Sequence, residues 1–292
     1  MRAKIKKLSK GSALAVFGAM LFGQAPDAAA SEPPRVVSMN LCTDQLLMLV
    51  AQPEQILSVS ELSRDRYLSM MHRESSHFPA NKGRAEEVYL YKPDLVLAGS
   101  YTSHASVSML QNLGITVELF SPLGSLADIP KAIERVGELV GQTEKAKELN
   151  AAFEQALKVA QQGDQRDEVR AATFYARRYT AGSGTLVHDT MEKSGLKNVA
   201  AELGLKGTQS MPLEMLVMEA PPVLVVGAPV SEGEALAFEV LSHPAFDRTT
   251  AKDGLVIMKD RYTICGLPYI SAAVEMLKKA GDKVATAAKG NS

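Results

Sequence analysis

A three-residue pattern that occurs twice in the chain constrains its fold more than any other feature. A glutamate is followed by a proline seven residues later and by a glycine six residues after the proline, first at Glu86, Pro93 and Gly99 and again at Glu214, Pro221 and Gly227. In each copy the residues before the proline predict a short helix, and the apolar run before the glycine predicts a strand buried on both faces. The two copies therefore predict two similar lobes, each with a glutamate in the first turn of an equivalent helix.

Strands and helices are expected to alternate on both sides of the middle of the chain. We expect strands at residues 35–39, 56–60, 95–98 and 116–120 with helices at 40–51, 84–91 and 107–113, and later strands at 171–175, 223–226 and 255–258 with helices at 186–194, 212–220, 234–241 and 267–280. Such alternation is typical of parallel α/β lobes.

The middle of the chain, residues 126–165, differs because apolar residues recur there at helical spacing and no strand is expected. The predicted fold class is α/β, with two lobes that are each a parallel sheet flanked by helices and are joined by a long interlobe helix. The N-terminal lobe is expected at residues 31–125, the connector at 126–165 and the C-terminal lobe at 166–292.

The first 30 residues predict a signal peptide. Five basic residues lie between Arg2 and Lys10, an apolar stretch too short to span a bilayer follows at residues 12–23, and three alanines end at Ala30. We expect cleavage near Ala30 and a soluble periplasmic protein. Cleavage would remove five of the 32 basic residues and one of the 33 acidic ones, and would leave a net charge near −5. This charge disfavours nucleic acid as a partner.

Catalytic motifs are missing from the sequence. Gly182, Ser183 and Gly184 do not form the nucleophile elbow of a secreted α/β hydrolase, and no acid–histidine pair follows them. The five histidines show no metal-ligand spacing, which disfavours a bare zinc or manganese site. We therefore predict a binding protein rather than an enzyme, with no catalytic and no metal-ligating residues. The secreted hydrolase is the alternative from another class.

The layout resembles the periplasmic substrate-binding proteins of ABC importers for cobalamin and iron–siderophore complexes. The resemblance covers the mature chain and rests on residues 82–86 leading into 92–97, on the entry at 36–40 and on the stretch 125–141. It implies a monomer with a rigid interlobe helix, a transported metal chelate held between the lobes and no permanent cofactor. It also implies that Glu86 and Glu214 dock onto arginines of an inner-membrane ABC permease. An iron–siderophore is the expected ligand and cobalamin is the alternative, weakened by the lack of tryptophan.

The ligand is expected at the carboxyl ends of the strands, where parallel α/β lobes bind small molecules. Arginines there suit an anionic ligand, and tyrosines offer both a ring and a hydroxyl. The resemblance adds Lys82 to this set. The predicted ligand-binding residues are Asn40, Cys42, Arg64, Lys82, Tyr101, Arg178, Tyr179, Arg261, Tyr262 and Cys265.

The two cysteines, Cys42 and Cys265, are both expected at the cleft. Three interpretations stay open from the sequence. They face the ligand as thiols that contact a metal, they form a disulfide between the lobes, or they are unpaired and buried.

Overall fold

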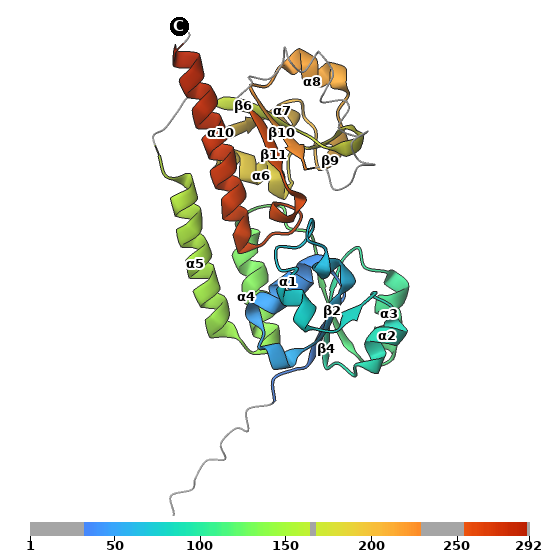
Figure 1. The fold of residues 1–292 in the computed structure, drawn as a ribbon. Coiled ribbons are helices and arrows are strands. Elements are labelled where there is room, and N and C mark those ends of the chain that lie inside the picture. The colour runs from blue at the N-terminus through green and yellow to red at the C-terminus, as the bar shows by residue number, and fades with distance from the viewer. Residues whose placement is uncertain (1–31, 164–167, 229–253, 291–292) are drawn as a thin grey trace, which may run out of the picture. The chain divides into compact units, whose positions relative to one another are not determined.

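A computed structural model describes residues 32–163, 168–228 and 254–290. The predicted signal peptide and the predicted helix at 234–241 lie outside the described residues. The first sheet, of which β2 and β4 are labelled in Figure 1, is parallel with strand order β3-β2-β1-β4-β5. Its strands are β1 (Val36–Ser38), β2 (Ile56–Ser60), β3 (Ala80–Asn81), β4 (Leu95–Gly99) and β5 (Thr116–Phe120).

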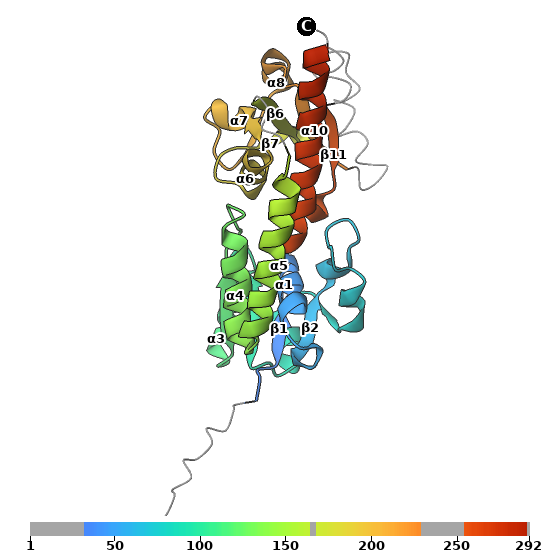
Figure 2. The same cartoon turned by 90° about the vertical axis from the view of Figure 1, so that its left-hand side faces the viewer.

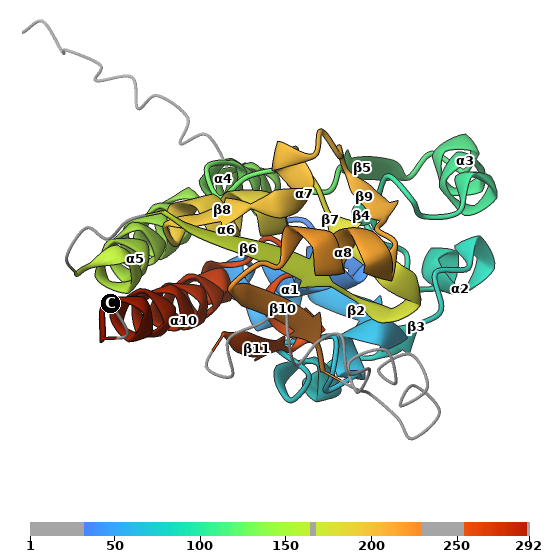
Figure 3. The ribbon, with the colours of Figure 1, turned by 90° about the horizontal axis from the view of Figure 1, so that it is seen from above.

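Helices cover both faces of this sheet. Helix α1 (Leu41–Val50) packs on one face, and α2 (Ala85–Leu90) and α3 (His104–Asn112) contribute Val88 and Leu110 to a separate apolar cluster on the other. Helices α2 and α3 lie on the far side of the lobe from α4 (Asp128–Val140) and α5 (Thr143–Gln161), the helices that follow this lobe in the chain (Figure 3).

The second sheet is also parallel, with strand order β11-β10-β6-β8. Its strands are β6 (Val169–Phe174), β8 (Leu196–Asn198), β10 (Val223–Gly227) and β11 (Leu255–Met258), and a short antiparallel pair, β7 (Tyr179–Ala181) and β9 (Thr208–Ser210), stands beside it. The helices of this lobe are α6 (Leu186–Lys193), α7 (Val199–Glu202) and α8 (Leu213–Glu219). The predicted fold class, two lobes with parallel sheets flanked by helices, is confirmed.

The two copies of the sequence pattern have the same local structure. Strands β4 and β10 are both five residues long and fully buried, and each pairs with the first strand of its lobe. The residue before each proline adopts a left-handed backbone, with φ 49° at Lys92 and φ 42° at Ala220. Non-glycine residues rarely adopt this conformation. The repeat therefore extends from the sequence to an unusual backbone turn.

The connector is a helical hairpin made of α4 (Asp128–Val140) and α5 (Thr143–Gln161). The two helices approach so closely at Gly137 that a Cβ there would lie 2.6 Å from Cβ of Ala146. The final helix, α10 (Ser271–Gly290), lies beside α5 (Figures 1 and 2). One buried apolar cluster runs from α1 through α4 and α5 to α6 and α10, so both lobes are packed against the same helices.

The last helix differs from its prediction at both ends. It begins at Ser271 rather than at residue 267, because Pro268–Ile270 first forms a 3-10 turn. It continues past the predicted end at residue 280, although Gly281 has a low helix propensity, because Gly281 and Val284 are buried. No helix in the described ranges is long and apolar enough to cross a membrane.

Candidate functional site

A hollow of about 250 Å³ lies where the carboxyl ends of β1, β4 and β5 meet the segment before α10. Four predicted ligand-binding residues, Asn40, Cys42, Tyr101 and Cys265, line it. The remaining lining residues are Thr43, Leu46, Gly99, Ser100, Phe120, Ser121, Pro122, Leu123, Ala132, Leu186, Thr263, Ile264 and Gly266. These residues come from both lobes and from the connector. The hollow therefore lies between the lobes, at the strand ends where the sequence predicts the ligand.

Asn40 is held in place by the start of α1 and by a glycine. Its side-chain oxygen accepts a hydrogen bond of 2.9 Å from the backbone N–H of Cys42, which caps the helix. The side chain packs over Gly99, where a Cβ would lie 2.7 Å from Nδ2 of Asn40. The glycine of the first repeat copy thus leaves room for a polar side chain at the edge of the hollow.

Cys42 and Cys265 form a disulfide, with an S–S distance of 2.06 Å and Cα atoms 5.2 Å apart. The interpretation of two metal-contacting thiols is therefore wrong, and so is that of two unpaired thiols. The bond joins α1 of the first lobe to the segment before α10 of the second. Gly266, the residue after Cys265, lets this segment approach Leu123 closely, because a Cβ at Gly266 would lie 2.5 Å from Cδ1 of Leu123.

Tyr101 offers the most exposed ring of the site. Its side chain follows β4 at the rim of the hollow and is 88% exposed. Phe120 ends β5 on the same lobe and also lines the hollow. Among the described lining residues none is charged, so the hollow offers hydroxyl and amide groups and apolar surface. This lining suits an uncharged or ring-shaped part of a ligand.

The charged residues predicted for ligand binding lie outside this lining. Arg64 is exposed and donates a hydrogen bond of 2.8 Å to the carbonyl of Phe78. Arg261 spans the lobes, because its N–H donates to the carbonyl of Tyr67 and its guanidinium donates to that of Arg66. The guanidinium of Arg261 also lies 5.6 Å from the centre of the Tyr262 ring.

Three more predicted residues also lie away from the hollow. Arg178 has a left-handed backbone with φ 64°, and Tyr179 begins β7 beside it. Both side chains are exposed, as is that of Lys82. The structure does not bring these three residues together with Asn40 and Tyr101. Their role as ligand contacts remains a prediction.

A buried carboxyl group lies directly beneath the site. Asp44 is on α1 next to Thr43, and its side chain accepts hydrogen bonds from the N–H and the hydroxyl of Ser60. Burial raises the pKa of Asp44 to about 7, although the hydrogen bonds from Ser60 act in the opposite direction. Sequence reasoning missed this residue, because an aspartate inside a helix gives no sign of burial.

Helices α2 and α8 present the two glutamates of the repeat in the same way, and we call them the docking helices because the sequence predicts docking at these glutamates. Glu86 and Glu214 are each the second residue of their helix, and both are exposed. Neither forms an ion pair or a side-chain hydrogen bond with the described residues. Within the described part of the chain both carboxylates are thus exposed and available to a partner.

Two neighbouring glutamates differ from the repeat glutamates, because they make contacts within their own lobes. Glu87 accepts a hydrogen bond of 2.8 Å from the N–H of Lys82, and Glu219 forms an ion pair with Arg170. Glu87 and Glu219 therefore stabilise their own lobes, whereas Glu86 and Glu214 make no such contact with the described residues.

A matched pair of arginines binds the chain at or just after the end of each docking helix. Arg35 precedes β1, donates 2.8 Å to the carbonyl of Lys92 and pairs with Asp94 at 3.2 Å. Arg170 stands at the corresponding position in β6, donates 3.1 Å to the carbonyl of Glu219 and pairs with Glu202 at 2.8 Å. Sequence reasoning missed both, although each lies directly before a residue that pairs with the repeat strand.

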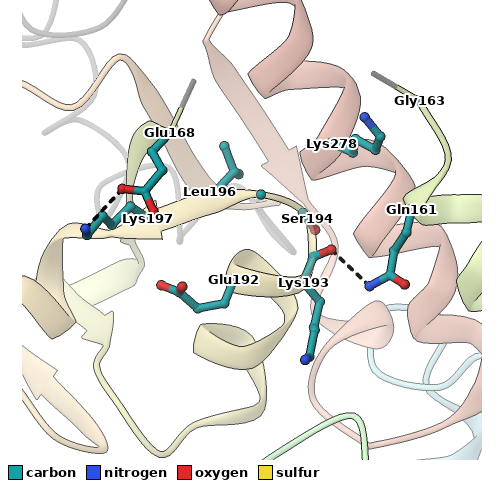
Figure 4. A pocket seen from close by; sticks show the side chains of 10 residues that line it. Gln161, Gly163, Glu168, Glu192, Lys193, Ser194, Leu196, Lys197 and Lys278 are labelled. Carbon is teal, nitrogen blue, oxygen red and sulfur yellow. Dashed lines mark hydrogen bonds and ion pairs between the residues drawn. The ribbon is translucent and has the colours of Figure 1, made fainter. Parts of the chain in front are cut away.

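A second hollow, of about 480 Å³, lies in the C-terminal lobe between the ends of α5 and α6, β8 and α10 (Figure 4). Lys197 pairs there with Glu168 at 3.1 Å, and Gln161 donates to the carbonyl of Lys193. None of the predicted ligand-binding residues lines it.

The fold and the interlobe hollow define a two-lobed binding protein, and comparison with known sequences agrees. Residues 36–258 match the family described as periplasmic binding protein, and the chain belongs to this family. A cobalamin-binding protein of Halobacterium salinarum is 26% identical over 226 residues, which are 75% of this chain and 61% of that protein. An uncharacterized ABC transporter substrate-binding lipoprotein of Bacillus subtilis is 26% identical over 204 residues, which are 66% of this chain and 63% of that protein. The chain thus spans about three fifths of the length of these curated relatives.

Solved structures show the same fold. A periplasmic heme-binding protein from Roseiflexus sp. RS-1 in its apo form has a TM-score of 0.70 at 19% identity, over 87% of this chain and 99% of that one. The periplasmic vitamin B12-binding protein of Vibrio cholerae has a TM-score of 0.66 at 17% identity, over 86% of this chain and 98% of that one.

Proposed function

We propose that this protein captures a metal chelate between its lobes in the periplasm and delivers it to an inner-membrane ABC permease. The observation that carries the proposal is the matched pair of docking helices, each of which exposes one glutamate that has no ion pair within the described residues. Two anions on similar lobes suit two cations on a symmetric permease. The protein acts as a monomer that reaches the periplasm through the leader at residues 1–30, with cleavage near Ala30.

The ligand is an iron–siderophore or a related iron complex, and a cobalamin or other corrinoid is the second candidate. The uncharged lining and the exposed ring of Tyr101 favour a ligand that presents a flat or apolar face to the hollow. At about 250 Å³ the hollow is slightly smaller than most ligand pockets, which hold roughly 300–1,000 Å³. We therefore expect one part of the chelate to enter it while the rest contacts Arg64, Arg178 and Arg261 at the surface. A secreted hydrolase is disfavoured, because Ser183 donates its hydroxyl to the carbonyl of Leu205.

A thermal-shift screen with ferric siderophores, haem and cobalamins tests the ligand class. A ligand at a hundred times its dissociation constant stabilises the folded state by about 2.7 kcal/mol, which raises the melting temperature measurably. Tyr101→Ala should reduce the shift that the bound chelate produces. If simple divalent ions shift the melting temperature and no chelate does, the proposed ligand class is wrong.

Chelate-dependent growth of a strain that lacks the protein tests the docking role. Glu86→Ala combined with Glu214→Ala should abolish complementation and leave chelate affinity unchanged. Glu148→Ala on α5 is the matched control, because Glu148 is also an exposed helical glutamate and forms no ion pair with any residue that the structure describes. Full complementation by the double variant, or loss of chelate affinity in it, would contradict the docking assignment.

A further inference from the structure

Each docking helix also exposes a large apolar side chain four residues after its glutamate. Leu90 follows Glu86 and is 79% exposed, and Met218 follows Glu214 and is 84% exposed. Residues four apart lie on the same face of a helix, one turn from each other. In both lobes a carboxylate and an apolar side chain therefore stand together on one helix face.

The opposite face of each docking helix attaches it to its lobe. Val88 and Leu216 lie two residues after the glutamates and are 0% and 1% exposed. Val88 packs under the first sheet and Leu216 under the second, in corresponding apolar clusters. Burial of these residues accounts for the attachment of the helices, and it leaves Leu90 and Met218 without a structural role in the described part of the fold.

A single exposed leucine is common on protein surfaces and carries no information. Here the same exposure occurs at the same position of two short helices that otherwise differ in sequence. Each helix is also fixed where it ends, because Arg35 binds the carbonyl of Lys92, two residues after α2, and Arg170 binds that of Glu219, the last residue of α8. The repetition on two anchored helices indicates a surface shaped for a partner.

We propose that each docking helix forms a two-part contact with the permease, in which the glutamate pairs with a cation and the apolar side chain enters a hollow beside that cation. This inference rests on the proposed function, since it assigns the partner of the same surface. The partner carries this combination twice, once for Glu86 with Leu90 and once for Glu214 with Met218. Charge complementarity sets the register of each contact, and burial of the apolar side chain adds affinity.

The test uses the permease that, together with this protein, restores chelate-dependent growth. The permease is reconstituted with its ATPase in proteoliposomes. The measured quantity is the concentration of chelate-loaded binding protein that half-maximally stimulates ATP hydrolysis. Leu90→Ser and Met218→Ser should each raise it about tenfold, equal to about 1.4 kcal/mol at 25 °C. Val159→Ser on α5 is the control, because Val159 is 54% exposed on the connector, and it should change nothing.

Further variants separate this inference from the docking role of the glutamates. Leu90→Met should stimulate like the wild type, because it keeps an apolar side chain at that position. Adding Leu90→Ser to Glu86→Ala should cost less than tenfold, because the two side chains serve one contact. If both serine variants match the wild type within twofold while Glu86→Ala and Glu214→Ala do not, the apolar contact is refuted and the glutamate docking stands. If none of the four variants has an effect, the docking surface itself is wrong.

Discussion

The disulfide between Cys42 and Cys265 should contribute a large part of the stability of the protein. It closes a loop with a sequence separation of 223 residues, and the chain-entropy relation for a loop of that size gives roughly 5 kcal/mol. For a protein of this length each kilocalorie shifts the melting temperature by roughly 2–4 °C. Cys42→Ser combined with Cys265→Ser should therefore lower the melting temperature by roughly 10–20 °C.

Calorimetry of the wild type and the double serine variant at neutral pH measures this difference. Reductant should lower the melting temperature of the wild type by a similar amount and leave that of the variant unchanged. A thiol count on the denatured, unreduced wild type should find no free thiol. A decrease of less than about 3 °C in the double variant would refute the entropic reasoning, and two free thiols in the wild type would refute the bond itself.

The same variant has a functional consequence that chelate-exchange kinetics can measure. The bond lies in the wall of the hollow, and Arg261 also bridges the lobes through the carbonyls of Arg66 and Tyr67. We expect the bound chelate to dissociate faster from the double serine variant, because the lobes then separate more easily. An unchanged dissociation rate would show that exchange does not require the lobes to separate at this point.

Three further substitutions test single features of the structure. Burial raises the pKa of Asp44 to about 7, so the unfolding free energy of the wild type should fall by as much as about 4 kcal/mol as pH rises from about 4 to about 7. Asp44→Asn should remove this decrease in denaturant titrations. Parallel pH profiles of unfolding free energy for the wild type and the variant would contradict it. Ala220→Gly should raise the unfolding free energy by about 1 kcal/mol, because φ at this position is 42°, and chemical denaturation that shows a loss would sink the idea. Gly99→Ala should lower the melting temperature and weaken chelate binding, because its Cβ would displace Asn40, the cap of α1; wild-type values for both would argue against this packing.

Sequence reasoning predicted the lobes and the docking helices, because these depend on local patterns. The prolines at 93 and 221 end short helices, and the apolar runs after them form strands that are buried on both faces, as continuous apolar runs in parallel sheets are. The position of Asn40 and Tyr101 at the hollow also followed from strand order alone, since the carboxyl ends of parallel strands share one edge.

Other features depend on contacts between distant segments, and the sequence left them open. The pairing of the cysteines required α1 and the segment before α10 to meet, which no local pattern indicates. Arg178 and Arg261 follow strands as predicted, but neither lines the hollow; the backbone at Arg178 is left-handed, and Arg261 donates a hydrogen bond to the other lobe. Gly281 continues a helix that its own propensity would end, because packing in the core outweighs it.

The connection between residues 42 and 265 also makes most of the polypeptide a closed covalent ring. A protease that cuts once within this ring, for example on the exposed surface of the connector, does not release either lobe. The two fragments should migrate as one species in a non-reducing gel and separate only after reduction. A two-lobed binding protein that is exposed to proteases would in this way tolerate a single cut without losing half of its binding site.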